Sequence, residues 1–155
     1  MKAIIFTDLD ASLLHEKTFS CSEIIDTLKS LISSGVLIVP NTSKTEVETR
    51  NVLKSLGLRT SFVIENGAKL CDIHQCFQFI GETDKEFGIE MSELNIRLEK
   101  LGDSSFANEF QPINKLKRKY AAQVLGLTGS ELEEALERQY SLLYQYIGQK
   151  SKIPF

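Results

Sequence analysis

Three short, wholly apolar runs separated by two amphipathic segments constrain the fold of this chain more than any other feature of its sequence. The runs are residues 3–6, 36–39 and 62–64. Short runs without a polar residue are typical of strands buried on both faces of a sheet. The segments between them, residues 22–35 and 47–57, repeat apolar residues at helical spacing. This order of strands and helices predicts right-handed βαβ units and an α/β fold around a parallel sheet.

Polar residues next to the two predicted helices mark where these helices begin and end. Ser22 is the expected cap of the first helix, and Gly35 is expected to end it. Thr42 and Ser43 precede the second helix, and both are capping residues by type. The pattern leaves open whether these two hydroxyl groups cap the helix or bind a ligand.

The second half of the chain has a different pattern. Two short segments, residues 69–73 and 76–80, are separated by two polar residues and predict a hairpin. Helical stretches follow at residues 84–101, 113–125 and 130–143. Ser130 and Glu133 have the spacing of a capping box for the last helix. The predicted domains are a core at residues 1–80, a second domain at 81–147 and a tail at 148–155.

Composition and charge exclude several classes of protein. The chain of 155 residues carries a formal net charge of −3, and its basic cluster at residues 115–119 has no interleaved aromatic residues, so we predict no nucleic-acid partner. No apolar run approaches about 20 residues, so neither a membrane span nor a signal peptide is expected. Cys21, Cys71 and Cys76 lack the spacing of a metal site or a disulfide framework, which favours a reducing cytoplasm.

Polar residues gather directly after each of the three predicted strands. Ligands bind at the carboxyl ends of the strands in open α/β sheets, so these residues are expected to meet at one edge. They are Asp8 and Asp10 after the first strand, Thr42, Ser43 and Lys44 after the second, and Glu65, Asn66 and Gly67 after the third. This convergence makes them the candidate functional residues of the chain.

The spacing of Asp8 and Asp10 suits two different roles in phosphoryl transfer. One carboxylate attacks phosphorus and becomes an aspartyl phosphate, while the other donates and accepts protons. The attacking carboxylate and the phosphate are both anions, so their charge must be neutralised. Mg2+ bound by carboxylate and phosphate oxygens can neutralise it. Thr42 is placed to bind a phosphoryl oxygen, and Lys44 is placed to add positive charge. Turn or cap roles are the alternative for the same residues.

The segments that contain these residues match the motifs of one enzyme superfamily. In the first half they are residues 8–14 (DLDASLL), 41–45 (NTSKT) and 64–68 (IENGA). In the second half they are residues 127–129 (LTG), 133–135 (EEA) and 138–141 (RQYS). Together they resemble the haloacid dehalogenase superfamily, and within it the mannosyl-3-phosphoglycerate phosphatases. The resemblance implies a partial Rossmannoid parallel sheet of the haloacid dehalogenase type with a small α/β cap domain.

The same resemblance implies a role for each candidate residue. It implies that Asp8 is the nucleophile, that Asp10 is the general acid and base, and that both hold Mg2+. Thr42 and Ser43 are implied to bind the phosphate group of a phosphorylated sugar or glycerate, such as mannosyl-3-phosphoglycerate. The further candidates for contact with this substrate are Lys44, Arg138 and Gln139.

The chain also departs from the family pattern, which keeps other functions open. Leu142 and Leu143 stand where Glu-Pro usually follows, and the third and fourth motifs, a phosphate-neutralising Lys and an acidic cluster, have no counterpart. A catalytically inactive remnant that binds a phosphorylated ligand is therefore the alternative. A phospho-receiver domain is disfavoured, because its phosphorylated Asp follows the third strand, where this chain has Glu65 and Asn66.

The resemblance further places the first predicted strand at an edge of the sheet, because the strands that lie beside it in the family are not found. An exposed apolar edge invites pairing with another strand. We therefore predict that the edge is covered, either by a second copy of the chain in a homodimer or by the carboxyl-terminal segment.

Overall fold

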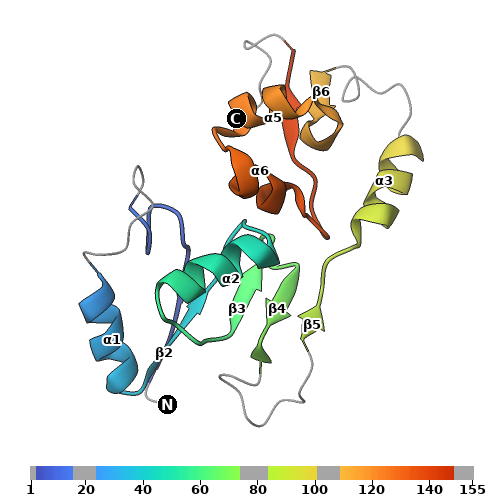
Figure 1. Cartoon of the computed structure of the whole chain (residues 1–155). Helices are drawn as coiled ribbons and strands as arrows, with labels where there is room; N and C mark the ends of the chain where they lie inside the picture. The colour runs from blue at the N-terminus through green and yellow to red at the C-terminus, as the bar shows by residue number, and fades with distance from the viewer. Residues whose placement is uncertain (1–2, 16–23, 74–83, 101–108, 149–155) are drawn as a thin grey trace. The chain divides into compact units, whose positions relative to one another are not determined.

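The chain folds into two compact units, Met1–Gly88 and Ile89–Phe155, each of which is described by itself (Figure 1). The computed structural model describes residues 3–15, 24–73, 84–100 and 109–148. The predicted domain boundary after residue 80 lies outside the described residues, as does nearly all of the predicted tail. Within the described ranges, no helix has both the length and the apolar character that a membrane span requires.

The first unit contains a parallel sheet, as the apolar runs predicted. β1 (Ala3–Thr7) and β2 (Val36–Pro40) pair in parallel along their whole lengths. β3 (Phe62–Ile64) is joined to the end of β2 by a parallel bridge between Asn41 and Val63. The predicted α/β fold class is therefore confirmed.

Two helices connect these strands and pack against them (Figure 1). α1 (Ile25–Ser33) follows β1, and α2 (Glu46–Ser55) follows β2. Leu28 of α1 belongs to the same buried cluster as Ile38 of β2, and Leu53 of α2 belongs to a second cluster with residues of β3. Burial of one apolar face of each helix holds it on the sheet.

The start of α2 is fixed by a capping box, but not by the residues that the sequence suggested. Thr45 Oγ1 accepts a hydrogen bond from the Glu48 backbone N–H at 3.3 Å, and the Glu48 carboxylate accepts one from the Thr45 N–H at 2.8 Å. The suggestion that Thr42 or Ser43 caps this helix is therefore wrong. Ser22, the expected cap of the first helix, lies outside the described residues.

A β-hairpin is present in the first unit, although its strands differ from the predicted pair. β4 (Lys69–Cys71) runs antiparallel to β3, and β5 (Lys85–Glu86) runs antiparallel to β4. The hairpin is therefore formed between β3 and β4, because the chain reverses directly after β3. The predicted partner at residues 76–80 lies outside the described residues.

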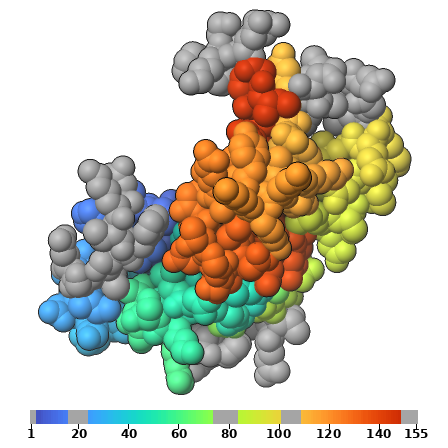
Figure 2. Space-filling model, turned by 45° about the horizontal axis from the view of Figure 1, so that its top comes forward, coloured from blue at the N-terminus to red at the C-terminus, as the bar shows by residue number. Residues whose placement is uncertain are grey.

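The described part of the second unit combines helices with a two-stranded antiparallel sheet. Its elements are α3 (Met91–Lys100), β6 (Phe110–Pro112), the 3-10 helix η2 (Ile113–Lys115), α5 (Arg118–Leu125), α6 (Gly129–Leu136) and β7 (Tyr144–Tyr146). β6 pairs with β7, and Ile113, Ala121 and Leu132 are buried together. Figure 2 shows α5 and α6 as one continuous orange surface.

Two of the three helices predicted in this half begin later than expected. The first begins at Met91 rather than Asp84, because Lys85 and Glu86 form β5 and pair with β4. The second begins at Arg118 rather than Ile113. The reason is Leu116, whose extended backbone (φ −75°, ψ 155°) separates a short 3-10 turn from the α-helix.

The third predicted helix is shorter at its end and begins with a different cap. It stops at Leu136 rather than Leu143, because the chain then extends to pair with β6. Thr128 is its N-cap and makes no side-chain capping hydrogen bond. Ser130 therefore lies inside the first turn, and the capping box predicted between Ser130 and Glu133 is wrong.

β1 has an open edge in the first unit. Among the described residues it pairs with β2 alone. Ile5 is 39% exposed and Phe6 is 63% exposed, which is unusual for a strand without a polar residue in its first four positions. Covering of this edge by a second copy or by the carboxyl-terminal segment stays a prediction.

Candidate active site

Backbone hydrogen bonds join the ends of β1, β2 and β3 at the carboxyl edge of the sheet. The Asn41 N–H donates to the Thr7 carbonyl at 2.8 Å, and the Thr42 N–H donates to the Val63 carbonyl at 3.0 Å. The Asn66 N–H in turn donates to the Thr42 carbonyl at 3.0 Å. The polar segments that follow the three strands therefore lie side by side, as the sequence predicted.

A tight turn anchored in the core carries Asp8 and Asp10. Leu9 between them is fully buried, and its carbonyl accepts hydrogen bonds from the N–H groups of Leu13 and Leu14 at 3.1 and 2.8 Å. Leu13 and Leu14 are buried in the same cluster as Leu9. The apolar residues therefore anchor the turn in the core, while Asp8 is exposed and Asp10 is partly buried.

The exposed side chain of Asp8 lines a hollow of about 390 Å³ at this edge. Its Oδ1 accepts a hydrogen bond from the Leu9 N–H at 2.7 Å. The residues around the hollow are Phe6, Thr7, Asp8, Asn41, Ser43 and Asn66. The amide and hydroxyl groups of this set are hydrogen-bond donors, which suit the oxygens of a phosphoryl group.

Asp10 lies beside Lys44, at the same edge of the sheet. Lys44 Nζ is 3.1 Å from Asp10 Oδ2, with side chains that are 19% and 39% exposed. Asp10 Oδ1 is buried and has no hydrogen-bond partner among the described residues. The described residues therefore satisfy only one oxygen of this carboxylate, and a donor or a cation would complete it.

Thr42 and Ser43 occupy different environments although they are adjacent in sequence. Thr42 is 2% exposed, and its Oγ1 accepts a hydrogen bond from the Lys44 N–H at 3.2 Å. Ser43 is exposed and lines the hollow beside Asp8. The structure thus brings Ser43 to the predicted nucleophile and gives Thr42 a buried position in the turn that presents Ser43 and Lys44.

Arg138 and Gln139 belong to the second unit. Arg138 Nη1 donates a hydrogen bond to Ser141 Oγ at 2.9 Å, and the Gln139 carbonyl accepts one from the Met91 N–H at 2.7 Å. These contacts hold the segment after α6 against the start of α3. Contact of Arg138 and Gln139 with a substrate stays a prediction.

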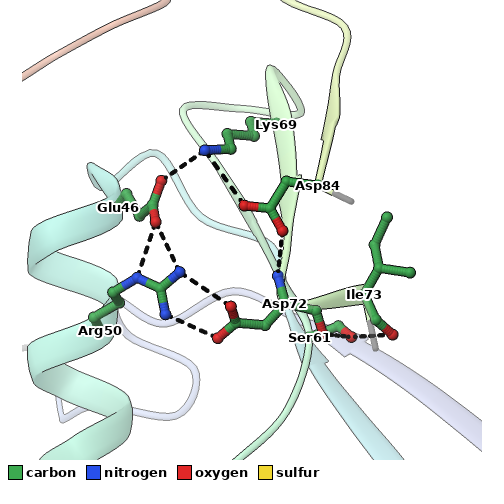
Figure 3. A network of polar contacts seen from close by, with 7 residues as sticks. All are labelled: Glu46, Arg50, Ser61, Lys69, Asp72, Ile73 and Asp84. Carbon is green, nitrogen blue, oxygen red and sulfur yellow. Dashed lines mark hydrogen bonds and ion pairs between the residues drawn. The ribbon is translucent and has the colours of Figure 1, made fainter. Parts of the chain in front are cut away.

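A second group of charged side chains involves α2, β4 and the residues that follow β4 and precede β5 (Figure 3). Lys69 Nζ is 2.9 Å from Glu46 Oε2 and 3.4 Å from Asp84 Oδ2. Arg50 donates to Glu46 Oε1 at 2.9 Å and to the two carboxylate oxygens of Asp72 at 2.8 and 3.1 Å. Every carboxylate of this charged network, defined by these five residues, therefore has a cationic partner.

The charged network occupies a place where acidic residues approach each other closely enough for a metal site. Ligand atoms of Glu46, Cys71 and Asp84 all lie within 4.8 Å of one another. Burial, together with the charge of Glu46, raises the pKa of Cys71 to about 12, so the thiol is neutral at physiological pH. The ammonium group of Lys69 already contacts both carboxylates, and Arg50 is a second cation beside Glu46. We therefore interpret the group as structural.

The pKa values of the network follow from the same contacts. Burial raises the pKa of Glu46, but hydrogen bonds from Lys69 and Arg50 and the charges of these two residues lower it below its ordinary value. Burial likewise lowers the pKa of Lys69, and the contact with Glu46 reverses the effect and raises it. Each ion is thus held in its charged form by its partner.

Asp8 and Asp10 fit a hard divalent cation better than the charged network does. Asp8 presents an exposed carboxylate to the hollow, and Asp10 Oδ1 is a buried acceptor without a partner among the described residues. Oxygen ligands of this kind are those that Mg2+ prefers. The two residues present therefore fit the ion that the sequence resemblance implies.

Asn41 and Asn66 line the hollow. Asn66 was among the candidate residues after the strands but was given no role, and Asn41 was not among these candidates. Both stand in the segments that carry the sequence resemblance, directly or shortly after a strand end. Their position after buried strands was the available signal, because side chains at the carboxyl edge face the ligand site of such sheets.

Comparison with known proteins agrees with this geometry. A model of the haloacid dehalogenase-like hydrolase family matches residues 5–84. A glucosyl-3-phosphoglycerate/mannosyl-3-phosphoglycerate phosphatase of Persephonella marina is 40% identical over 65 residues, which cover 42% of this chain and 24% of that protein. A mannosyl-3-phosphoglycerate phosphatase of Pyrococcus horikoshii is 29% identical over 154 residues, covering 91% of this chain and 59% of that protein.

Solved structures show the same fold at lower sequence identity. A haloacid dehalogenase-like hydrolase from B. subtilis is similar with a TM-score of 0.54 and 19% identity, over 86% of this chain and 49% of that one. A protein of Thermotoga maritima is similar with a TM-score of 0.50 and 16% identity, over 89% and 53%. The matched regions cover between 24% and 59% of the length of these four proteins. The matched family model, which includes Asp8, Asp10 and the whole carboxyl edge, shows that the chain belongs to the haloacid dehalogenase-like hydrolase family.

Proposed function

We propose that the first unit catalyses Mg2+-dependent hydrolysis of a phosphomonoester through an aspartyl phosphate on Asp8. The observation that carries this proposal is the exposed carboxylate of Asp8 in a polar hollow at the carboxyl edge of a parallel sheet. Membership of the hydrolase family supports it. The reducing cytoplasm is the proposed location, on the basis of the cysteine pattern of the sequence.

In the proposed first step, a carboxylate oxygen of Asp8 attacks the phosphorus of the substrate. A bond forms between this oxygen and phosphorus, and the bond from phosphorus to the leaving alcohol oxygen breaks. In the second step, water attacks the phosphorus of the aspartyl phosphate, inorganic phosphate leaves and the Asp8 carboxylate is restored. Because Asp8 is exposed in the hollow, both the substrate and water can reach it.

Asp10 is the proposed proton carrier in both steps. It gives a proton to the departing alkoxide and takes one from the attacking water, so that the protons balance over one cycle. Lys44, 3.1 Å from Asp10 Oδ2, orients this carboxylate and adds positive charge at the edge of the site. A carboxylate with one oxygen paired to Lys44 and the other without a hydrogen-bond partner among the described residues is suited to exchange a proton with a bound group.

Binding of the phosphoryl group is assigned to the hydroxyl and amide groups of the hollow. Ser43, which lines the hollow, donates to a phosphoryl oxygen. Thr42 Oγ1 accepts the Lys44 N–H, so the hydroxyl proton of Thr42 is directed away from that contact and is the second proposed donor. When bound, Mg2+ neutralises charge on the phosphate and the attacking carboxylate. Asp8 and Asp10 would hold it.

The proposed substrate is a phosphorylated sugar or glycerate. Support comes from the two similar phosphatases, whose names specify mannosyl- or glucosyl-3-phosphoglycerate. The match to the Pyrococcus horikoshii protein extends over most of this chain and so includes the second unit. Arg138 and Gln139 of that unit are the proposed contacts with the remainder of the substrate.

The test is release of inorganic phosphate from mannosyl-3-phosphoglycerate and a panel of sugar phosphates, with and without Mg2+. Asp8→Asn is compared with Asp26→Asn, a matched change at an exposed aspartate in the first turn of α1. The proposal expects Mg2+-dependent release that Asp8→Asn reduces by about 10⁴-fold or more and Asp26→Asn leaves unchanged.

Two results would contradict the proposal. Equal turnover by Asp8→Asn and the unaltered chain would remove Asp8 as nucleophile. Absence of release from every substrate, with saturable binding of the same phosphorylated compounds, would instead establish the alternative of a phospho-ligand-binding module without turnover.

A further inference from the structure

A second and larger hollow lies in the first unit and shares no lining residue with the hollow at Asp8. Its volume is about 570 Å³. The side chains that matter to the argument are Arg50, Lys54, Leu58, Arg59, Phe62 and Asp72. They come from α2, from the loop that leads into β3, from the start of β3 and from the residue after β4. We refer to this site as the basic hollow.

The basic hollow lies at the opposite end of the strands from the proposed catalytic site. Phe62 is the first residue of β3, and Arg59 precedes it in the connecting loop. Asn41 and Asn66, by contrast, follow the ends of β2 and β3. A ligand in the basic hollow would therefore not be in contact with Asp8.

The charges of the basic hollow do not cancel. Arg50 is paired with Glu46 and Asp72 within the charged network. Lys54 and Arg59 make no ion pair within the part of the chain that the structure describes. Two cationic side chains thus face one concave surface, on a chain whose formal net charge is −3. Such a surface attracts an anion.

Arg50 gives the basic hollow a fixed planar surface. Its guanidinium lies 5.1 Å from the centre of the Phe62 ring, and its donors contact Glu46 and Asp72 (Figure 3). The Arg50 side chain is nevertheless 43% exposed and lines the hollow. The hydrogen bonds to Glu46 and Asp72 fix the orientation of this guanidinium. A guanidinium in a fixed orientation can stack on a planar group.

We propose that the basic hollow binds a phosphate-bearing ligand with a planar part, of the nucleoside diphosphate class. Its phosphates contact Lys54 and Arg59, and its planar group stacks on Arg50 beside Leu58. The volume lies in the range of small-molecule sites and is much larger than free phosphate requires. The proposal is independent of the phosphatase proposal, because the two hollows have no residue in common.

The test is titration of the full chain with ADP by isothermal calorimetry, in EDTA so that Mg2+ is absent. Lys54→Gln/Arg59→Gln is compared with Lys29→Gln/Lys85→Gln, which removes the same two charges from exposed positions outside both hollows. The first double variant is expected to lower the affinity for ADP by about tenfold or more, because two charge-assisted contacts are lost. The second is expected to change it by less than about twofold.

Two further arms separate the parts of the proposal. Asp8→Asn should bind ADP as the unaltered chain does, and inorganic pyrophosphate should bind more weakly than ADP because it has no planar group. Absence of saturable ADP binding, equal losses in the two double variants, or loss in Asp8→Asn would overturn the proposal. Equal affinities for pyrophosphate and ADP would overturn the stacking contact with Arg50.

Discussion

Among the residues that the structure describes in the first unit, lysine and carboxylate groups meet at two places, and these differ in how completely their charges are satisfied. At the carboxyl edge, Lys44 contacts one oxygen of Asp10, and the other oxygen has no hydrogen-bond partner among the described residues. In the charged network, Lys69 contacts both Glu46 and Asp84. The first arrangement leaves one carboxylate oxygen unsatisfied among the described residues, whereas every carboxylate of the second has a cationic partner.

This difference shows that proximity of acidic groups is a poor guide to a functional site. Glu46 and Asp84 approach each other closely enough to hold a metal ion, yet an ammonium group already lies between them. At Asp8 and Asp10, one carboxylate is exposed, and the other has an oxygen without a hydrogen-bond partner in the described part of the chain. The unsatisfied group, rather than the dense cluster, marks the place where chemistry is expected.

The largest effect on catalysis after loss of Asp8 is expected from Asp10→Asn. The amide cannot carry a proton between alcohol, carboxylate and water, so kcat should fall by about 10²- to 10⁴-fold. The free energy of unfolding should change by less than about 1 kcal/mol, because the pair with Lys44 is partly exposed. Steady-state kinetics and urea denaturation measure the two quantities.

The matched control for this change is Asp72→Asn in the charged network. Asp72 accepts two hydrogen bonds from Arg50, and the amide can accept only one and brings donors that Arg50 cannot use. We expect a loss of about 1 kcal/mol in unfolding free energy and unchanged kcat. A kcat reduced in Asp72→Asn as strongly as in Asp10→Asn would contradict the division into site and scaffold.

Replacement of Lys69 should affect mainly stability, whereas replacement of Lys44 should affect mainly kcat. Lys69→Met leaves two partly buried carboxylates without their shared cation, and we expect it to lower the free energy of unfolding by about 2 kcal/mol. Lys44→Met should lower stability by less than about 1 kcal/mol, because its partner is 39% exposed, and should lower kcat by roughly tenfold. Lys85→Met, at an exposed position in β5, is the control for loss of a lysine.

A smaller effect on the free energy of unfolding is expected when the pH is lowered. The pKa of Glu46 is lower in the folded than in the unfolded chain. Its contribution to stability is therefore complete above the ordinary glutamate pKa of about 4.3 and is lost as the pH falls through the folded value. Unfolding free energy measured between about pH 5 and pH 3 should fall more steeply for the unaltered chain than for Glu46→Gln. Parallel curves would show that this carboxylate is not stabilised by the network.

The smallest effect on catalysis is expected from Ile5→Lys on the open edge of β1. We propose that a second copy of the chain covers this edge, because β1 pairs with β2 alone among the described residues and because Ile5 and Phe6 are exposed. A lysine on an edge strand opposes pairing, so sedimentation equilibrium should show weaker self-association with unchanged kcat. A chain that is monomeric at all concentrations before the substitution would remove this proposal.

The parallel sheet could be predicted from the sequence because its strands are short apolar runs that end at polar residues. The same signal led to Asp8 and Ser43 at one hollow, since strand ends of a parallel sheet meet at one edge. Helical periodicity was a weaker guide in the second unit. There, residues 144–146 form a strand by pairing with β6, a contact that no local pattern encodes.

The partners of individual side chains could not be predicted from the sequence either. The cap of α2 is Thr45 rather than Thr42 or Ser43, because the chain first uses these two residues to turn at the carboxyl edge. The pairing of Lys69 with Glu46 joins residues that are 23 positions apart. Such contacts depend on how β4 lies against α2, which the separate patterns of the two segments do not specify.

The most direct test of the proposed function is to trap the phosphoryl group on the enzyme. The chain is mixed with substrate and Mg2+, quenched in acid within one turnover, digested and examined by mass spectrometry. The account predicts one phosphoryl group on Asp8, which is absent in Asp8→Asn and accumulates when Asp10→Asn slows hydrolysis of the intermediate. Turnover without a phosphoryl group on Asp8, or a phosphoryl group on another residue, would contradict it.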